Sequence, residues 1–306
     1  MKKIRYLFCA YVPHWTAGGC MVMHLFAKML SDMGEDVYMT LAHDVRNREN
    51  YTAVLPGSGN NAKEITSYEE AMALAQEDDV AVIYPEIVSG NPMNAKKVIR
   101  WVLYYPGGHG AGDMVYDSSE LIFTYFDRYL KGTSHENSPL LTIVETRLNQ
   151  FFSMEGIARE YDCILIKKGA ANFETLKERY LNPNYQLLDK PIFILDGLLD
   201  KLNDVAQLNG IFNQVRNFIS FDQATYYNIM ASLSGCTSIV LPINDMSREQ
   251  WTKEMPLYQH GVAYGFDDIE RANDTKFQLV ASLRETEKEN FVHANKFIEM
   301  VNSRWN

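Results

Sequence analysis

The chain has 306 residues, which is long enough for two domains of ordinary size and a substantial hydrophobic core. Apolar residues make up 46% of it and charged residues 22%, as in a soluble globular protein. There are 29 basic and 39 acidic residues, so the net charge is −10. Because binding to nucleic acid needs a positive surface, we expect no nucleic acid among the partners.

Local features argue against two further classes of protein. No apolar run approaches the roughly 18–20 residues of a membrane-spanning helix, and the apolar stretch after Lys3 suits a buried strand better than a signal peptide. The four cysteines are scattered and form no CxxC pair: Cys9, Cys20, Cys163 and Cys236. We therefore expect reduced thiols in a cytoplasmic protein and no zinc site.

The beginning of the chain predicts a Rossmann-like unit. A buried strand is expected at Ile4–Tyr11, then a loop ending in Gly18 and Gly19, a helix over Cys20–Met33 and a strand at Asp36–Leu41. The dinucleotide fingerprint GxGxxG is absent. Main-chain N–H groups near the two glycines are candidates to meet phosphate or sugar, although these glycines equally suit a simple tight turn.

Two later strands end in polar segments. Strands are expected at Val80–Tyr84 and Trp101–Tyr105, with a helix over Ala95–Arg100 before the second. Glu86 and His109 follow these strands, and ligands of an open parallel sheet bind beyond its carboxyl ends. Either residue is a candidate general base. The alternatives are that Glu86 caps a helix and that His109 only bonds a turn.

The second half of the chain continues the strand–helix pattern. Strands are expected at Leu140–Glu145 and at Cys163–Lys167, on either side of a domain boundary. Lys167 and Lys168 stand at the end of the second strand, where at least one can reach over the sheet edge to a phosphate group. Two solvated loop lysines are the alternative.

The segment from Asn217 to Pro242 predicts a complete strand–helix–strand unit. Buried parallel strands are expected at Asn217–Phe221 and Thr237–Leu241, with a helix over Ala224–Leu233 between them. A helix N-terminus at the carboxyl edge of a sheet favours phosphate. Five residues there form a candidate site: Asp222, Gln223, Ala224, Thr225 and Tyr226. An ordinary unit in which Asp222 caps the helix is the alternative.

This segment resembles the donor-binding segment of GT-B glycosyltransferases, particularly retaining enzymes resembling glycosyltransferase family 4. There an acidic residue, seven residues and a glutamate precede a small-residue turn and a strand. Asp222, Met230 and Gly235 occupy the matching positions, so Met230 replaces the glutamate that normally holds the donor ribose. Phe221–Thr225 (FDQAT) also approximates the YDP-x-T segment of poorly characterised polysaccharide glycosyltransferases. Gly34–Val37 (GEDV) is similar to the GT-B amino-terminal domain.

The resemblance implies an α/β fold with two Rossmann-like domains facing across a cleft. Residues 1–145 are then the acceptor-side domain and residues 146–285 the nucleotide-sugar domain. Residues 286–306 form a helix that returns to the first domain, after a separate helix over Ile269–Leu283.

The function implied by this resemblance is transfer of a hexose or deoxyhexose from a nucleotide sugar to a glycan, glycolipid or other hydroxyl acceptor. It implies no metal and no cofactor, and Lys167 or Lys168 neutralises the departing diphosphate. An inverting enzyme needs Glu86 or His109 as base, whereas a retaining enzyme mainly needs leaving-group stabilisation. A nucleotide-sugar epimerase and a non-catalytic binding module stay open as alternatives. The absence of GxSxG, P-loop and HExxH patterns argues against the common hydrolases, NTPases and metalloproteases.

Overall fold

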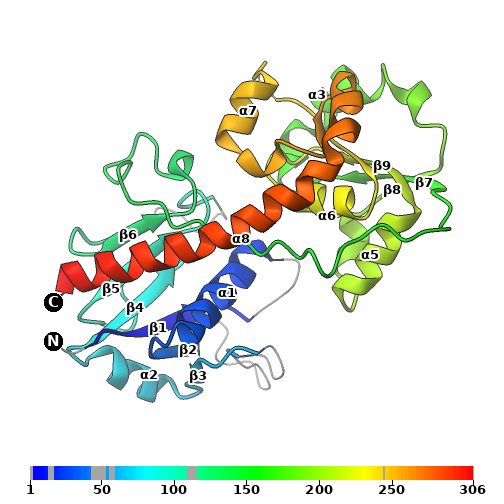
Figure 1. The fold of residues 1–306 in the computed structure, drawn as a ribbon. Coiled ribbons are helices and arrows are strands. Elements are labelled where there is room, and N and C mark those ends of the chain that lie inside the picture. The colour runs from blue at the N-terminus through cyan, green and yellow to red at the C-terminus, as the bar shows by residue number, and fades with distance from the viewer. Residues whose placement is uncertain are drawn as a thin grey trace. The chain divides into compact units, whose positions relative to one another are not determined.

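The computed structural model describes residues 3–12, 17–42, 53–54, 59–108, 116–243 and 245–305. The chain divides into two compact units. The first unit is Met1–Glu145 together with Glu287–Asn306, and the second unit is Thr146–Thr286. Each unit is built on one sheet whose paired strands are all parallel (Figure 1).

The sheet of the first unit has the strand order β3-β2-β1-β4-β5-β6. Its strands are β1 (Arg5–Ala10), β2 (Val37–Leu41), β3 (Lys63–Glu64), β4 (Val80–Pro85), β5 (Val98–Val102) and β6 (Leu121–Thr124). The chain moves outward from β1 to β3 and then returns to the other side of β1 with β4. The strand order therefore reverses between β1 and β4, which is the arrangement of a doubly wound sheet.

Helices cover both faces of this sheet. On one face, α1 (Gly18–Asp32) and the end of α8 (Ile269–Trp305) share a core in which the rings of Phe26 and Phe297 are 5.0 Å apart. On the other face lies α2 (Tyr68–Ala75), whose first turn is capped by Ser67. Both faces of the strands are thus buried, as their apolar sequences require.

The sheet of the second unit has the order β11-β10-β9-β7-β8. Its strands are β7 (Tyr161–Leu165), β8 (Ile192–Ile194), β9 (Val215–Ser220), β10 (Thr237–Val240) and β11 (Val262–Tyr264). Its helices are α3 (Phe173–Leu176), α4 (Asp196–Leu199), α5 (Val205–Gln214), α6 (Tyr227–Leu233), α7 (Arg248–Glu254) and the first part of α8. Here the strand order reverses at β7, which has β8 on one side and β9 on the other.

Two predicted elements are wrong. The helix expected at Ala95–Arg100 is absent, because β5 begins at Val98 and pairs with β4 from there. The strand expected at Leu140–Glu145 is reduced to one bridge between Thr124 and Leu140. The side chain of Asn290 accepts from the N–H of Val144 and donates to its carbonyl, both at 2.9 Å. These two hydrogen bonds take the place of those that a neighbouring strand would make.

The two helices predicted near the end of the chain form a single helix. α8 runs without interruption over 37 residues and contains neither glycine nor proline. The hydroxyl of Thr286, where a new helix was expected to begin, instead donates to the carbonyl of Ser282 at 3.1 Å. Such a back-bond satisfies a threonine inside a helix, so this residue marks no boundary.

Candidate functional site

The candidate site of the second unit lies at the carboxyl ends of β7 and β9. Ligands of doubly wound sheets bind where the strand order reverses, and these two strands flank that point. Lys167 and Lys168 follow β7, and Asp222 follows β9. The main-chain N–H of Lys168 donates to the carboxylate of Asp222, so the two predicted segments meet at this edge.

The turn that carries the lysines is fixed by one carboxylate. Asp196 accepts hydrogen bonds from the N–H groups of Ile166 and Lys167, at 2.8 and 2.7 Å. Lys167 has a φ of +40°, in the left-handed region that few side-chain-bearing residues adopt. Both lysine side chains are exposed, and the Nζ of Lys167 lies 5.6 Å from the ring centroid of Tyr227. The turn therefore presents two cations to solvent at the sheet edge.

Gly169 allows this turn to pack against the end of β9. A Cβ atom at Gly169 would lie 2.2 Å from the carbonyl oxygen of Phe221, which no side chain tolerates without a backbone shift. The glycine is needed because backbone approaches backbone here. It therefore determines how closely Lys168 approaches Asp222.

Asp222 stabilises a turn before α6 rather than capping the helix. Its Oδ1 accepts the N–H of Ala224 at 3.0 Å, which is the hydrogen bond of an Asx turn. The side chain is 6% exposed. Burial raises the pKa of Asp222, while the N–H of Ala224 and the charge of Lys168 oppose that rise. α6 consequently begins at Tyr227, later than predicted.

The phosphate seat predicted at the start of this helix is smaller than expected. The N–H groups of Asn228 and Ile229 already donate to the carbonyls of Thr225 and Tyr226, at 3.2 and 3.0 Å. Thr225 is itself 9% exposed. First-turn amides that are paired in this way are not available to an anion. The exposed lysines are therefore the principal phosphate-binding candidates of this edge.

Sequence reasoning missed two residues of this site. The hydroxyl of Tyr226 donates to the carbonyl of Thr146 at 2.9 Å, which brings the neighbouring Arg147 to α6. Tyr227 is 6% exposed, and within the described part of the chain its hydroxyl has no hydrogen-bond partner. Burial raises the pKa of Tyr227 to about 12, and the charge of Arg147 opposes that rise. A cation and a buried hydroxyl thus lie beside the lysine turn.

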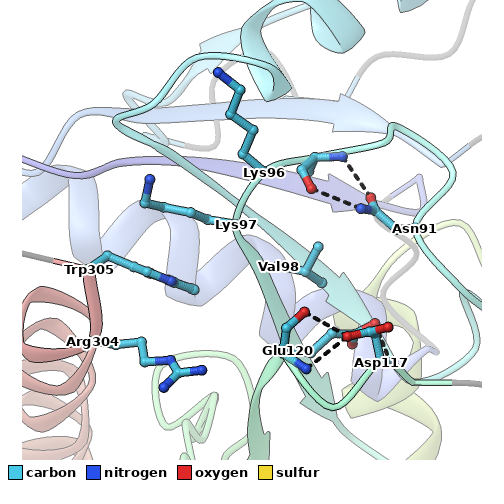
Figure 2. A pocket seen from close by; sticks show the side chains of 10 residues that line it. Asn91, Lys96, Lys97, Val98, Asp117, Glu120, Arg304 and Trp305 are labelled. Carbon is cyan, nitrogen blue, oxygen red and sulfur yellow. Dashed lines mark hydrogen bonds between the residues drawn. The ribbon is translucent and has the colours of Figure 1, made fainter.

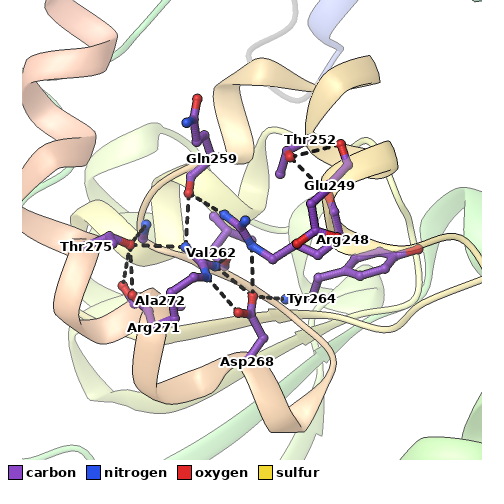
Figure 3. A network of polar contacts seen from close by, with 11 residues as sticks. Arg248, Glu249, Thr252, Gln259, Val262, Tyr264, Asp268, Arg271, Ala272 and Thr275 are labelled. Atoms are coloured by element: carbon purple, nitrogen blue, oxygen red, sulfur yellow. Dashed lines mark hydrogen bonds and ion pairs between the residues drawn. The ribbon is translucent and has the colours of Figure 1, made fainter.

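A polar network joins two helices near the turn that follows β9 (Figure 3). Asp268 accepts from the Nε of Arg271 at 2.6 Å and pairs with the Nε of Arg248 at 3.4 Å. These contacts join α7 to the first turn of α8. From α7, the indole of Trp251 donates to the carbonyl of Gln223 at 3.2 Å. The turn after β9 is thereby held by groups from several elements.

The first unit places its predicted residues at the reversal between β1 and β4. Gly18 and Gly19 are the first two residues of α1 rather than the end of a loop. Glu86 follows β4, is 4% exposed, and accepts the N–H of Leu103 at its Oε2 at 3.0 Å. Burial and the charge of Glu86 raise the pKa of Cys20. The glycines and the carboxylate therefore share one edge of this unit.

A buried arginine fixes the loop that carries Glu86, and sequence reasoning missed it. Arg100 is completely buried on β5, where its Nε donates to Glu120 at 2.9 Å. It also donates to the carbonyls of Val88 and Gly90. Its neighbours in sequence predict a helix, so nothing local indicates this role. The other predicted base, His109, lies outside the described residues.

The described residues contain neither a metal-binding cluster nor a membrane-spanning helix. Among the residues that the structure describes, no group of three or more His, Cys, Asp or Glu side chains is placed to hold a metal ion. Over the same residues, every helix is too short or too polar to cross a membrane. All four cysteines are free thiols.

Solved structures with a similar fold are glycosyltransferases. An alpha-glucosyltransferase in complex with UDP and a 13-mer DNA containing a HMU base has 12% identity and a TM-score of 0.53, over 97% of this chain and 95% of that one. The same kind of enzyme with UDP and a 13-mer DNA containing a central A:G mismatch has 11% identity and a TM-score of 0.50, over 96% and 94%. The glycotransferase of kitacinnamycin has 13% identity and a TM-score of 0.47, over 100% of both chains. No protein-family model and no curated protein matches the sequence.

These comparisons confirm one prediction and overturn another. The chain has the α/β fold of GT-B glycosyltransferases, with a parallel sheet in each of two units. The predicted membership of glycosyltransferase family 4 stays a prediction. The exclusion of nucleic-acid partners is wrong, because proteins of this fold are solved with DNA bound. Acidic net charge describes the whole surface and does not exclude a local binding site for DNA.

Proposed function

We propose that the protein is a glycosyltransferase that moves a sugar from a nucleoside diphosphate to a hydroxyl acceptor. One observation carries the proposal: the strand reversal of the second unit is flanked by the cations Lys167, Lys168 and Arg147. The nearby carboxylates of Asp222 and Asp196 accept main-chain N–H groups and so hold the turns of this edge, and the side chains of Lys167 and Lys168 are exposed. The fold shared with UDP-bound glucosyltransferases supports the same donor class.

In this proposal the lysine turn neutralises the departing diphosphate. Charge-assisted hydrogen bonds from lysine to phosphate are stronger than neutral ones, and they become more important as charge develops on the leaving group. The hydroxyl of Tyr227 supplies a further donor beside Lys167. We place this neutralisation on protein cations rather than on a metal ion, so activity should persist in EDTA.

The acceptor belongs to the first unit in this proposal. Glu86 lies at the reversal between β1 and β4 and is the candidate base, and at the start of α1 a Cβ atom on Gly18 would meet open space. Glycans and glycolipids are the acceptors that the resemblance implies. DNA enters the test as well, because the similar glucosyltransferases are solved with it.

The proposal is tested with a panel of UDP-, GDP- and dTDP-sugars, each with and without glycan and DNA acceptors. Nucleoside diphosphate release that depends on an acceptor is the expected result. Lys167→Ala should reduce this release, whereas Lys190→Ala, an exposed lysine elsewhere in the unit, should leave it unchanged. Isomerisation of a donor in the absence of an acceptor would show that the protein is a nucleotide-sugar epimerase and not a transferase. Failure to bind any donor would refute the proposal.

A non-catalytic nucleotide- or glycan-binding module is the second candidate, and one observation favours it. Met230 is 5% exposed on α6, at the position where similar enzymes carry a glutamate for the donor ribose. A buried thioether cannot replace that carboxylate as a hydrogen-bond acceptor. Binding of a nucleoside diphosphate sugar without turnover, under every acceptor condition, would establish this alternative.

A further inference from the structure

A hollow of about 480 Å³ lies on the first unit at the opposite edge from Glu86 (Figure 2). It is formed by residues just before β5 and β6, at their amino ends, and by the end of α8. Its principal lining residues are Asn91, Lys96, Lys97, Glu120, Arg304 and Trp305. Sites for small molecules typically measure about 300–1,000 Å³, so this hollow is large enough for one.

The acidic groups around this hollow are already engaged. Glu120 pairs with the buried Arg100 at 2.9 Å. Asp117 accepts from the N–H and the hydroxyl of Ser119, at 2.8 and 2.7 Å, and these bonds lower its pKa. Asp78, beyond the rim, pairs with Lys96 at 2.7 Å. Glu120 and Asp78 are thus each paired with a cation, and the hydrogen bonds of Asp117 stay within its own turn.

Two cations of the hollow form no direct ion pair with a carboxylate among the described residues. The ammonium of Lys97 donates to the main-chain carbonyl of Asp78 and interacts with the carboxylate of that residue only through its charge. Arg304 is exposed and makes no hydrogen bond or ion pair with any part of the chain that the structure describes. It also borders a second hollow of about 440 Å³, which Glu299 lines as well. The lining of the first hollow has three cations, Lys96, Lys97 and Arg304, and two carboxylates, Asp117 and Glu120, which is an excess of one positive charge in a chain of net charge −10.

An indole ring completes the arrangement. Trp305 is half-buried and lines the hollow beside Arg304, and both project from the end of α8 (Figure 2). A guanidinium matches a phosphate group through two parallel hydrogen bonds, and an indole offers an apolar face to a ring. The hollow thus combines groups for an anion with a surface for a planar or cyclic moiety.

We propose that this hollow binds a small phosphorylated molecule that carries a ring, with Arg304 and Lys97 on the phosphate and Trp305 against the ring. A nucleoside monophosphate and a sugar phosphate share this chemistry. The site lies at the amino ends of the strands, whereas the reactants of the proposed transfer bind at the carboxyl ends. The bound molecule is therefore an additional ligand, and the inference does not depend on the proposed function.

The test uses the full chain and three probes: inorganic phosphate, glucose 6-phosphate and adenosine 5′-monophosphate. Binding is measured by calorimetry and by tryptophan fluorescence. We expect a ring-bearing probe to bind and to quench Trp305, and inorganic phosphate to bind more weakly. The stronger of the two ring-bearing probes identifies the source of the ligand. Arg304→Gln and Lys97→Gln should each weaken binding by about 10- to 100-fold.

Matched variants separate this site from others. Arg284→Gln removes an exposed arginine from the same helix, about 30 Å away along its axis, and should leave binding unchanged. Lys167→Ala, at the donor edge, should also leave it unchanged. Trp305→Phe should abolish the quenching. Absence of binding by all three probes would overturn the proposal, as would a folded Arg304→Gln variant that binds like the parent.

Discussion

The two units place different side chains at the same topological point. In the second unit, the reversal of strand order is flanked by the exposed cations Lys167 and Lys168. In the first unit, the reversal is flanked by the buried carboxylate of Glu86 and by a helix that begins with two glycines. Topology therefore fixes where a ligand binds in each sheet, while local charge decides which ligand it is. A cationic edge suits a diphosphate, and an edge with a carboxylate suits a neutral hydroxyl compound.

The carboxylates at both edges are stabilised in the same way. Asp196 and Asp222 accept main-chain N–H groups in the second unit, and Glu86 accepts that of Leu103 in the first. Buried carboxylates need such donors, because an unpaired buried charge is strongly unfavourable. In the second unit, the exposed Lys167 and Lys168 also act on Asp222 through their charges, whereas at the edge of the first unit the helix α1 begins with two glycines. The predictions below test that difference.

The largest expected effect concerns the carboxylate of the first unit. A general base contributes about 10²–10⁴ in rate, so Glu86→Gln should lower turnover by that factor and leave nucleoside diphosphate affinity unchanged. The amide oxygen of glutamine still accepts the N–H of Leu103, which preserves the fold. Turnover and calorimetric binding are measured separately, and a melting curve checks folding. A loss of only a few-fold would remove Glu86 from the chemistry and leave His109→Ala as the variant to examine.

The cations of the second unit should affect binding instead. Lys167→Ala or Lys168→Ala should weaken nucleoside diphosphate binding by about 1.5–3 kcal/mol if the lysine contacts phosphate directly. Calorimetry at two salt concentrations measures this, since a lost charge contact also reduces the salt dependence. Lys190→Ala is the matched control. If both site variants bound the nucleoside diphosphate like the parent, the lysines would not contact it. The charge difference between the two edges would then not determine where the diphosphate binds.

The lysine turn also depends on the close approach at Gly169. Gly169→Ala should lower the free energy of unfolding by about 1–3 kcal/mol, because its Cβ would overlap the carbonyl of Phe221. Gly210→Ala is the control: its Cβ meets open space inside α5, and it should stabilise the helix by about 0.5–1 kcal/mol. Denaturant unfolding measures both. Equal effects of the two variants would contradict the tight packing.

The sequence predicts a helix or strand well where the residues of that element alone determine its structure. The unit from Asn217 to Pro242 follows from apolar strands and a glycine with positive φ at Gly235. The elements that were missed depend on distant partners instead. Asn290 takes the hydrogen bonds expected of a strand at Val144, across 146 positions in sequence. No local pattern contains that information.

The same distinction applies to the candidate site. Strand ends and the order of the segments predict that Lys168 and Asp222 lie at one sheet edge. The contribution of Arg147 depends on a hydrogen bond between Tyr226 and Thr146, which are 80 positions apart. The sequence does not distinguish the Asx turn at Asp222 from the helix cap that was left open as the alternative, because both uses place an acidic residue just before a helix.

The smallest effect expected is the pH dependence that Asp222 confers. Burial raises its pKa in the folded chain above the value of about 3.9 for an unfolded aspartate. Its favourable contribution is therefore complete below the unfolded pKa and is lost as the pH rises through the folded pKa. Removing the carboxylate with Asp222→Asn should make the variant gain stability relative to the parent as the pH rises through this window.

The ionisation of the Asp222 carboxylate is measured by how the stability difference between variant and parent changes with pH, and not by the stability at any one pH. An asparagine has one acceptor oxygen where the carboxylate has two, so it accepts the N–H groups of Ala224 and Lys168 less favourably, and a constant loss is expected at every pH. The melting temperatures of both proteins are measured from about pH 3.5, just below the unfolded pKa of aspartate, to about pH 7. This series separates the pH-dependent contribution from the constant one. If the variant instead lost stability relative to the parent as the pH rose, the nearby lysines would stabilise the carboxylate more than burial penalises it. The second unit would then hold Asp222 as an ion-pair partner, and its lysines would be less available to a diphosphate than the comparison of the two edges requires.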